Sequence, residues 1–337
     1  MNGSPPQEPS VSEDRGGGSP IGGRLTRARA TRVVVFWSIV ALGASTAVFV
    51  LFRTDDNPIE AIIGAWPVVI ASAALYVAGM ITYALSWARL FESNRRALGL
   101  GFLISQPIKY LPGGIAQPIG QIALGVEATG QAAPILIAFP VHVLINVVAA
   151  ATLGAPLLLV AEVPSWVRWL VVLTPLLWTL LDRRWMRTVL DLIGRRIPKL
   201  RVESALPQQS LINRAFLTAL LAHGMMFLSF GVLTASGVPG WSILELSTAF
   251  AAAWLVGYVV IPSPAGLGAR EAALFAFLGG ALSGTEVVGI AAVHRVMTMV
   301  LELAMMGVAV WLARRRAHPA APVSPPGDGP TSHVDPA

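Results

Sequence analysis

The chain of 337 residues contains no cysteine and few charged side chains. The absence of cysteine excludes disulfides, thiol nucleophiles and thiolate metal sites. Charged residues make up 12% of the chain, whereas a soluble domain carries about 25%. Hydrophobic residues make up 55%, and the mean hydropathy is +0.67. The composition therefore excludes an ordinary soluble domain and indicates an integral membrane protein.

Patterns typical of common enzyme classes are also missing. The sequence contains no P-loop, no Rossmann glycine pattern and no acidic metal cluster. Ser263 lacks the flanking glycines of an intramembrane serine protease motif. The five histidines show no paired spacing of the kind that binds metals (His142, His223, His294, His318 and His333). We therefore expect no enzyme activity, no metal and no cofactor.

The net charge of +6 comes from basic residues at the ends of apolar runs. The basic residues are Arg24, Arg27, Arg29 and Arg32, then Arg89, Arg95, Arg96 and Lys109, seven between 183 and 201, and finally Arg314, Arg315 and Arg316. This placement is typical of cytoplasmic anchors under the positive-inside rule, not of nucleic-acid binding. It predicts a multi-pass protein of the cell inner (plasma) membrane with both termini in the cytoplasm.

Apolar runs predict an all-α protein with about eight transmembrane segments between residues 33 and 313. The expected segments are 33–52, 62–91, 132–160, 166–181, 214–236, 243–261, 269–282 and 286–313. Residues 1–32 and 314–337 are predicted to be disordered cytoplasmic tails, the second opening with a basic anchor. The loop 182–213 is predicted to carry an amphipathic helix on the inner leaflet. Run 269–282 is shorter than the ~20 residues that cross a bilayer, so it either re-enters or forms a short tilted span.

The sequence PSPAGLGARE at 262–271 interrupts two apolar runs with helix breakers and adjacent opposite charges. Irregular backbone at membrane depth is tolerated only where protein buries it or where it lines a wet cavity. An intramembrane charge costs about 2.5–3.5 kcal/mol on insertion scales, so Arg270 and Glu271 indicate a functional site. The alternative is a cytoplasmic loop in which both charges are solvated.

A similar break occurs upstream at Pro112, Gly113 and Gly114, inside an irregular region, 95–129, that we expect to be re-entrant or interfacial. It matches Pro264 and the residues after it at an offset of 152. Broken segments at corresponding positions of two halves indicate a transporter's central site. The match suggests an internal repeat, although a chain with 32 Gly and 25 Pro produces short matches by chance.

Two kinds of ligand contact are expected at these breaks. The backbone at Gly266 and Gly268, together with Arg270, suits a phosphate group at a helix N-terminus. Glu271 either binds a headgroup or caps its own helix.

Arg295 and Glu302 lie seven residues apart, on one face of the last span. Glu302 lies about 18 Å from Arg314 along the helix, near the membrane midplane. It needs a cationic partner, either Arg270, Arg295 or a lipid headgroup. A purely structural ion pair is the alternative. His142, Asn146 and His223 are expected to bond across helices.

The sequence from Pro262 to Ala272 resembles the P-x-P-G-G-L-G-x-R-E-x pattern of the lysylphosphatidylglycerol synthase transmembrane region, a flippase-like family. Ala265 replaces the first glycine of that pattern. Tyr110–Gly114 resembles the upstream Y-L-P-G element, and His294-Arg295 resembles the start of the family's last helix. The resemblance covers about residues 30–315 and implies a membrane region that moves lipids between leaflets. Only 21 residues follow Arg316, so it implies no aminoacyltransferase domain here.

The leading hypothesis is a flippase-like protein that binds or moves an anionic phospholipid or a polyprenyl-phosphate-linked lipid. One alternative is a non-catalytic membrane partner of a glycosyltransferase or lipid synthase. Another is a small-solute transporter, which would need a polar path through both faces of the membrane. The spans carry few polar groups that could line such a path.

Overall fold

The computed structural model describes residues 65–110, 116–160, 170–194, 206–238, 240–259 and 268–315. Every regular element in this part of the chain is helical, which confirms the all-α prediction. The predicted first span, the first tail, residues 316–337 of the second tail and the residues at the centre of the two Pro/Gly breaks lie outside the described residues.

Four described helices are long and apolar enough to cross a membrane. They are α3 (Trp66–Ala88), α6 (Ala132–Gly154), α11 (Gln209–Thr234) and α14 (Gly284–Arg314). Each coincides with a span predicted from hydropathy. Helix α6 continues through Pro140 and ends at Gly154, just before Pro156. The length and composition of these helices are those of a membrane protein.

The other described helices are shorter. They are α4 (Arg95–Ser105), η1 (Gln106–Tyr110), α5 (Ala116–Thr129), α7 (Leu157–Val160), α9 (Leu170–Leu177), η2 (Trp178–Leu181), α10 (Arg183–Gly194), η3 (Ala235–Gly237), α12 (Ile243–Val259) and α13 (Ala269–Leu278). The ten residues of α13 extend about 15 Å, half the ~30 Å hydrocarbon core, so α13 alone does not cross. Eight crossings therefore stay a prediction, while α10 confirms a helix in the basic loop.

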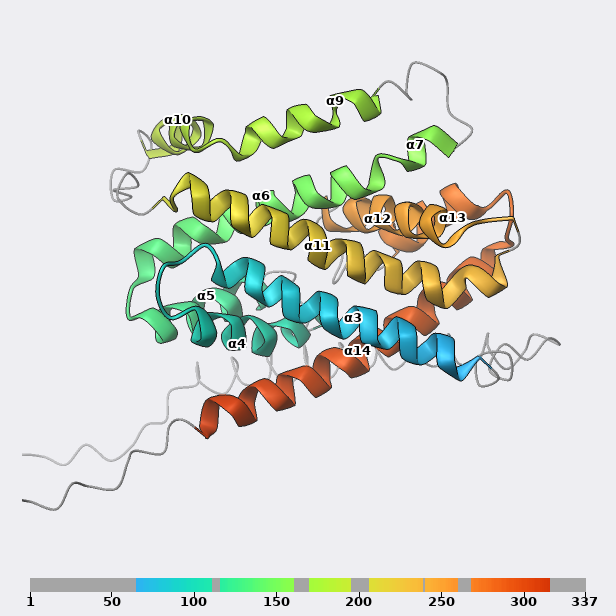
Figure 1. The fold of residues 1–337 in the computed structure, drawn as a ribbon, viewed down its shortest axis with the longest axis horizontal. Helices are drawn as coiled ribbons and strands as arrows, with labels where there is room; N and C mark the ends of the chain where they lie inside the picture. The colour runs from blue at the N-terminus through green and yellow to red at the C-terminus, as the bar shows by residue number, and fades with distance from the viewer. Residues whose placement is uncertain are drawn as a thin grey trace, which may run out of the picture.

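Helices α3 and α11 form the centre of the molecule and run side by side in opposite directions (Figure 1). Helix α14 packs against α3 and α4, while α6 and α12 pack against α11 from the other side. The short helices α4 and α5 lie together at one end of the bundle, and α13 lies with α12 at the other (Figure 1). The interrupted segment α4–η1–α5 therefore contacts the last long helix.

Small residues allow these helices to approach closely. A Cβ atom at Gly79 of α3 would lie 2.7 Å from Met226 Cγ of α11. Between the same two helices, Ser72 Oγ donates a 2.8 Å hydrogen bond to the backbone oxygen of Ser229. Transmembrane helices associate through such close packing and interhelical hydrogen bonds, because lipid provides no hydrophobic driving force.

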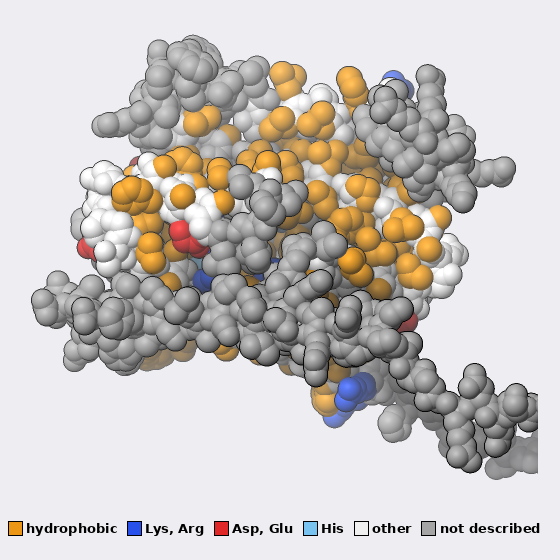
Figure 2. Space-filling view, turned by 180° about the vertical axis from the view of Figure 1, so that it is seen from behind, with side chains coloured by type: hydrophobic (Ala, Val, Ile, Leu, Met, Phe, Trp, Pro, Cys, Tyr) orange, Lys and Arg blue, Asp and Glu red, His pale blue; other side chains and the backbone are white. Residues whose placement is uncertain are grey.

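Hydrophobic side chains cover much of the described surface, and basic side chains gather at the end of α14 (Figure 2). Exposed apolar residues of α14 include Val296, Val300 and Val308. At its last turn Arg315 lies over the ring of Trp311, 3.7 Å from the ring centroid. An apolar exterior that ends in Trp and Arg is typical of a helix that reaches the membrane interface.

The closest packing in α11 yields a stability prediction. A Cβ atom at Gly231 would lie 2.3 Å from the backbone oxygen of Ile243 in α12. Gly231→Ala should therefore separate α11 from α12 and lower the unfolding free energy by about 1–3 kcal/mol, measured by thermal unfolding in detergent. Gly224→Ala in the same helix is the control, because nothing lies within 4 Å of its added Cβ. Equal stability of the two variants would contradict the observed packing.

Candidate functional site

Five of the predicted site residues are described, and they lie on two neighbouring helices. Gly268 precedes α13, Arg270 and Glu271 form its first turn, and Arg295 and Glu302 lie on α14. The remaining five predicted residues (Pro112, Gly113, Gly114, Pro264 and Gly266) fall in 111–115 and 260–267, outside the described residues. A cavity shared by the two breaks stays a prediction, but the structure describes the residues on either side of each break.

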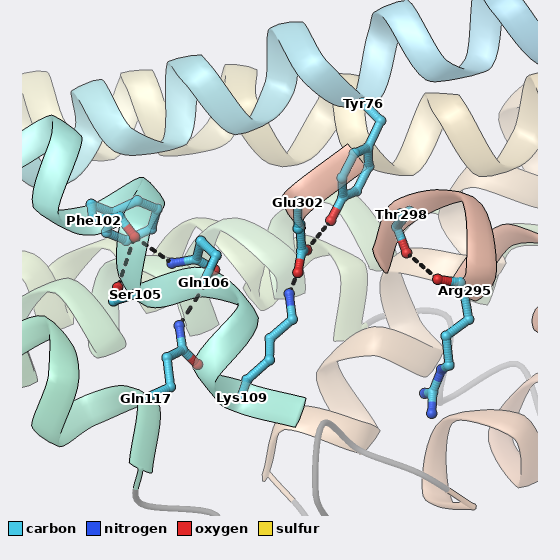
Figure 3. A network of polar contacts seen from close by, with 9 residues as sticks. All are labelled: Tyr76, Phe102, Ser105, Gln106, Lys109, Gln117, Arg295, Thr298 and Glu302. Carbon is cyan, nitrogen blue, oxygen red and sulfur yellow. Dashed lines mark hydrogen bonds and ion pairs between the residues drawn. The ribbon is translucent and has the colours of Figure 1, made fainter. Parts of the chain in front are cut away.

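Glu302 is the most deeply buried acid of the cluster, with 1% of its surface exposed. The hydroxyl of Tyr76 from α3 donates a hydrogen bond to Glu302 Oε1. Lys109 Nζ from η1 lies 2.5 Å from the same oxygen. Figure 3 shows Tyr76 and Lys109 reaching this carboxylate from opposite sides. Three elements that are distant in sequence therefore meet at one carboxyl group.

The cationic partner of Glu302 is Lys109, which corrects two sequence interpretations. Glu302 was expected to pair with Arg270, Arg295 or a headgroup, and Lys109 was assigned to a cytoplasmic anchor. The structure places Lys109 in a 3-10 helix that packs against α14, so its side chain turns inward. Hydropathy does not distinguish the two positions, because a lysine after an apolar run is also typical of the membrane interface.

Glu271 uses both of its carboxylate oxygens. Oε2 accepts a 2.7 Å hydrogen bond from the backbone N–H of Gly268, whose φ of +84° favours glycine. Oε1 lies 3.0 Å from Arg295 Nη2. The proposed helix cap at Glu271 is therefore observed, and an ion pair to α14 accompanies it.

Arg270 lies beside the middle of α12. Its guanidinium carbon is 5.5 Å from the ring centroid of Phe250, which lies midway between the two ends of that helix. Its Nε atom is buried and has no hydrogen-bond partner among the described residues. The pairing of Glu271 with Arg295 likewise places the start of α13 against the interior of α14. Both charges of the downstream motif thus lie next to the interior of an apolar helix, Arg270 beside α12 and Glu271 beside α14.

Aromatic rings connect Arg270 with Glu302. Phe250 stacks on Phe230 with ring centroids 4.2 Å apart. The His294 ring packs edge-on against Phe250, Phe230 and Tyr76, at centroid distances of 5.0, 5.3 and 6.2 Å. These rings exclude water from one side of the charged groups, which strengthens electrostatic interactions there.

The charged side chains of the cluster do not balance. Among the described residues of the cluster, three cations (Lys109, Arg270 and Arg295) lie with two carboxylates (Glu271 and Glu302), so three minus two leaves one positive charge in this part of the chain. Arg270 and Arg295 are close enough to repel each other. The side chains of Lys109, Glu271 and Arg295 retain 26%, 20% and 19% exposure. The cluster thus combines excess positive charge with a partly open side, an arrangement suited to an anion.

A second polar cluster joins α3, α6 and α11. Asn146 Nδ2 donates a 2.6 Å hydrogen bond to Tyr83 Oη across α6 and α3, which confirms its predicted interhelical role. The His142 ring stacks on Tyr83 at 5.3 Å. His223 differs from the prediction, because its Nδ1 lies 2.8 Å from the backbone oxygen of Ala219 in its own helix. This cluster packs the helices together.

No family model matches this chain, and neither does any curated protein. The geometry of the charged cluster is therefore the basis for inferring a function. The family resemblance remains a hypothesis carried by the Pro/Gly motifs.

The contact between Tyr76 and Glu302 makes the site testable through stability. Tyr76→Phe removes a hydrogen-bond donor to the buried carboxylate of Glu302 and should lower the unfolding free energy by about 1.5–3 kcal/mol. Thermal unfolding in detergent measures this loss. Thr82→Val on the same helix is the matched control, because its hydroxyl bonds only to its own helix at Ala78. A Tyr76→Phe protein as stable as the control would show that the hydrogen bond contributes nothing.

Proposed function

We propose that the chain is a flippase-like membrane protein that binds an anionic lipid headgroup, from a phospholipid or a polyprenyl-phosphate-linked lipid, and moves it across the membrane. The observation that carries the proposal is the buried Nε atom of Arg270, which lacks a hydrogen-bond partner among the described residues. A buried polar group without a hydrogen-bond partner lowers stability by about 1–3 kcal/mol, and a charged group lowers it by more. A ligand that accepts a hydrogen bond from Arg270 would recover that free energy.

Three features favour an anion in this position. The cluster has one excess positive charge, counted above. Arg270 lies in the first turn of α13, where the helix dipole attracts negative charge. Gly268, two residues before Arg270, has a positive φ angle. Nothing lies within 4 Å of the position where its Cβ atom would be, so the backbone there is open to a ligand. Phosphate groups suit this combination of arginine, glycine and helix N-terminus.

A lipid is favoured over a soluble anion by what surrounds the cluster. Long apolar helices flank it, and apolar side chains cover much of the described surface on the face that Figure 2 shows. A headgroup in the polar cluster with its acyl or prenyl chains against the outer helix faces satisfies both environments.

Reconstitution into vesicles with labelled phosphatidylglycerol or polyprenyl phosphate tests the proposal through leaflet accessibility of the label. Arg270→Ala should abolish exchange by the inserted protein. Arg270→Lys should restore it only in part, because an ammonium lacks the planar fork that pairs with phosphate oxygens. Arg96→Ala is the control, an exposed arginine on α4 away from the cluster.

Two results would contradict lipid movement. Equal exchange by wild type and Arg270→Ala would remove Arg270 from the site. Absence of exchange by the wild type alone, together with co-purification of a membrane synthase or glycosyltransferase, would favour the docking-partner alternative.

A further inference from the structure

Three glutamines flank the upstream Pro/Gly break, and we call them the amide row (Gln106, Gln117 and Gln121). Gln106 opens η1 and is 3% exposed, and Gln121 in α5 is 4% exposed. Gln117 lies four residues before Gln121, so the two side chains share one face of α5. A buried amide is unfavourable unless hydrogen bonds satisfy it, so each of these side chains needs a partner.

The amide row is only partly satisfied. Gln117 Nε2 donates to Gln106 Oε1 at 3.4 Å, and Gln106 Nε2 donates to the backbone oxygen of Phe102 at 3.5 Å. Both distances exceed the range of about 2.7–3.2 Å that is usual for such bonds. Nε2 of Gln121 is buried with no hydrogen-bond partner among the described residues. The row therefore retains capacity to bind a further polar group.

The amide row adjoins the charged cluster. Side chains three residues apart in a 3-10 helix are eclipsed, so Gln106 and Lys109 share one face of η1. Figure 3 shows both residues on η1, with Gln117 next to Gln106. Lys109 Nζ is 5.3 Å from the ring centroid of Tyr110, which in turn interacts electrostatically with Arg270. From Gln106 to Tyr110 the helix rises about 8 Å, so the amides and the charged groups lie at opposite ends of one short element.

We propose that the amide row binds hydroxyl groups of the headgroup, so that the lipid is one whose phosphate carries a polyol, either a glyceryl or a glycosyl group. The inference rests on the proposed function, in which Arg270 binds the phosphate. A hydroxyl group both donates and accepts a hydrogen bond, so it pairs with either end of an amide. A polyol is uncharged and suits glutamine, whereas phosphate suits arginine.

Gln121 separates this role from helix packing. A buried polar atom without a partner lowers stability, so an apolar side chain of similar size should pack at least as well there. Gln121→Met should therefore leave the temperature of thermal unfolding unchanged or raise it. Loss of hydroxyl recognition in the same variant would show that Gln121 acts on the ligand.

Binding of two short-chain lipids to the full chain tests the amide row. Dihexanoyl phosphatidylglycerol and dihexanoyl phosphatidylmethanol carry the same single negative charge, but only the first has hydroxyl groups on its headgroup. Calorimetry uses lauryldimethylamine oxide, because a maltoside detergent would itself present sugar hydroxyls. The wild type should bind phosphatidylglycerol about ten-fold more tightly than phosphatidylmethanol, as expected for two added hydrogen bonds.

Four variants assign the contributions. Gln121→Met and Gln117→Met should bind both probes with similar affinity. Arg270→Ala should weaken binding of both probes and leave their ratio unchanged. Gln131→Met is the control, an exposed glutamine just before α6, and it should keep the wild-type ratio. If Gln121→Met does not fold, the wild-type ratio and Gln117→Met still decide the question.

A third probe identifies the source of the polyol. Glucosyl geranyl phosphate presents a sugar on a polyprenyl phosphate, and it should compete with phosphatidylglycerol for the same site. Tighter binding of the glucosyl probe supports a glycosyl headgroup, and tighter binding of phosphatidylglycerol supports a glyceryl headgroup.

Failure of the amide row is distinguishable from failure of the proposed function. Equal affinity of the wild type for phosphatidylglycerol and phosphatidylmethanol overturns hydroxyl recognition and leaves the anion site intact. Absence of binding of every probe by the folded wild type overturns both. A ten-fold preference that persists in Gln117→Met and Gln121→Met assigns the hydroxyl groups to other residues and overturns the role of the row.

Discussion

The buried carboxylate of Glu302 constrains the rest of the site. It lies near the middle of a 31-residue apolar helix, where an unpaired charge is strongly unfavourable. The structure meets this constraint with Tyr76 from the first described long helix and Lys109 from a broken segment. These contacts hold η1 and α3 against α14. They also place the polar groups of Tyr76 and Lys109 inside a region for which hydropathy predicts only apolar contacts.

Helix α14 also joins the two Pro/Gly motifs. Lys109, three residues before Pro112, pairs with Glu302, and Glu271, three residues after Gly268, pairs with Arg295. The two α14 positions are seven residues apart, which is two helical turns on one face. Side chains that flank the two Pro/Gly motifs thus contact one face of α14, while a central cavity between the motifs stays a prediction.

Hydropathy predicted the four long helices because a span needs only about 20 apolar residues, and the predicted and observed spans coincide. The charged cluster was predicted in part, since Arg270, Glu271, Arg295 and Glu302 are charges in apolar surroundings. The partners of Glu302, Lys109 and Tyr76, were not predicted, because the ion pair with Lys109 depends on the direction in which η1 turns after α4. Tyr76 carried a weak cue, as one of only four tyrosines in the chain within an otherwise apolar run.

The ion pair between Lys109 and Glu302 is the central claim, and a double-mutant cycle on unfolding free energy tests it most directly. The cycle uses Lys109→Met, Glu302→Gln and the combined variant in detergent. Each single change should destabilise the protein, and the double variant should be less destabilised than their sum, with a coupling energy of about 1–3 kcal/mol. Single effects that add, with a coupling energy near zero, would show that the two side chains do not interact and would contradict this account.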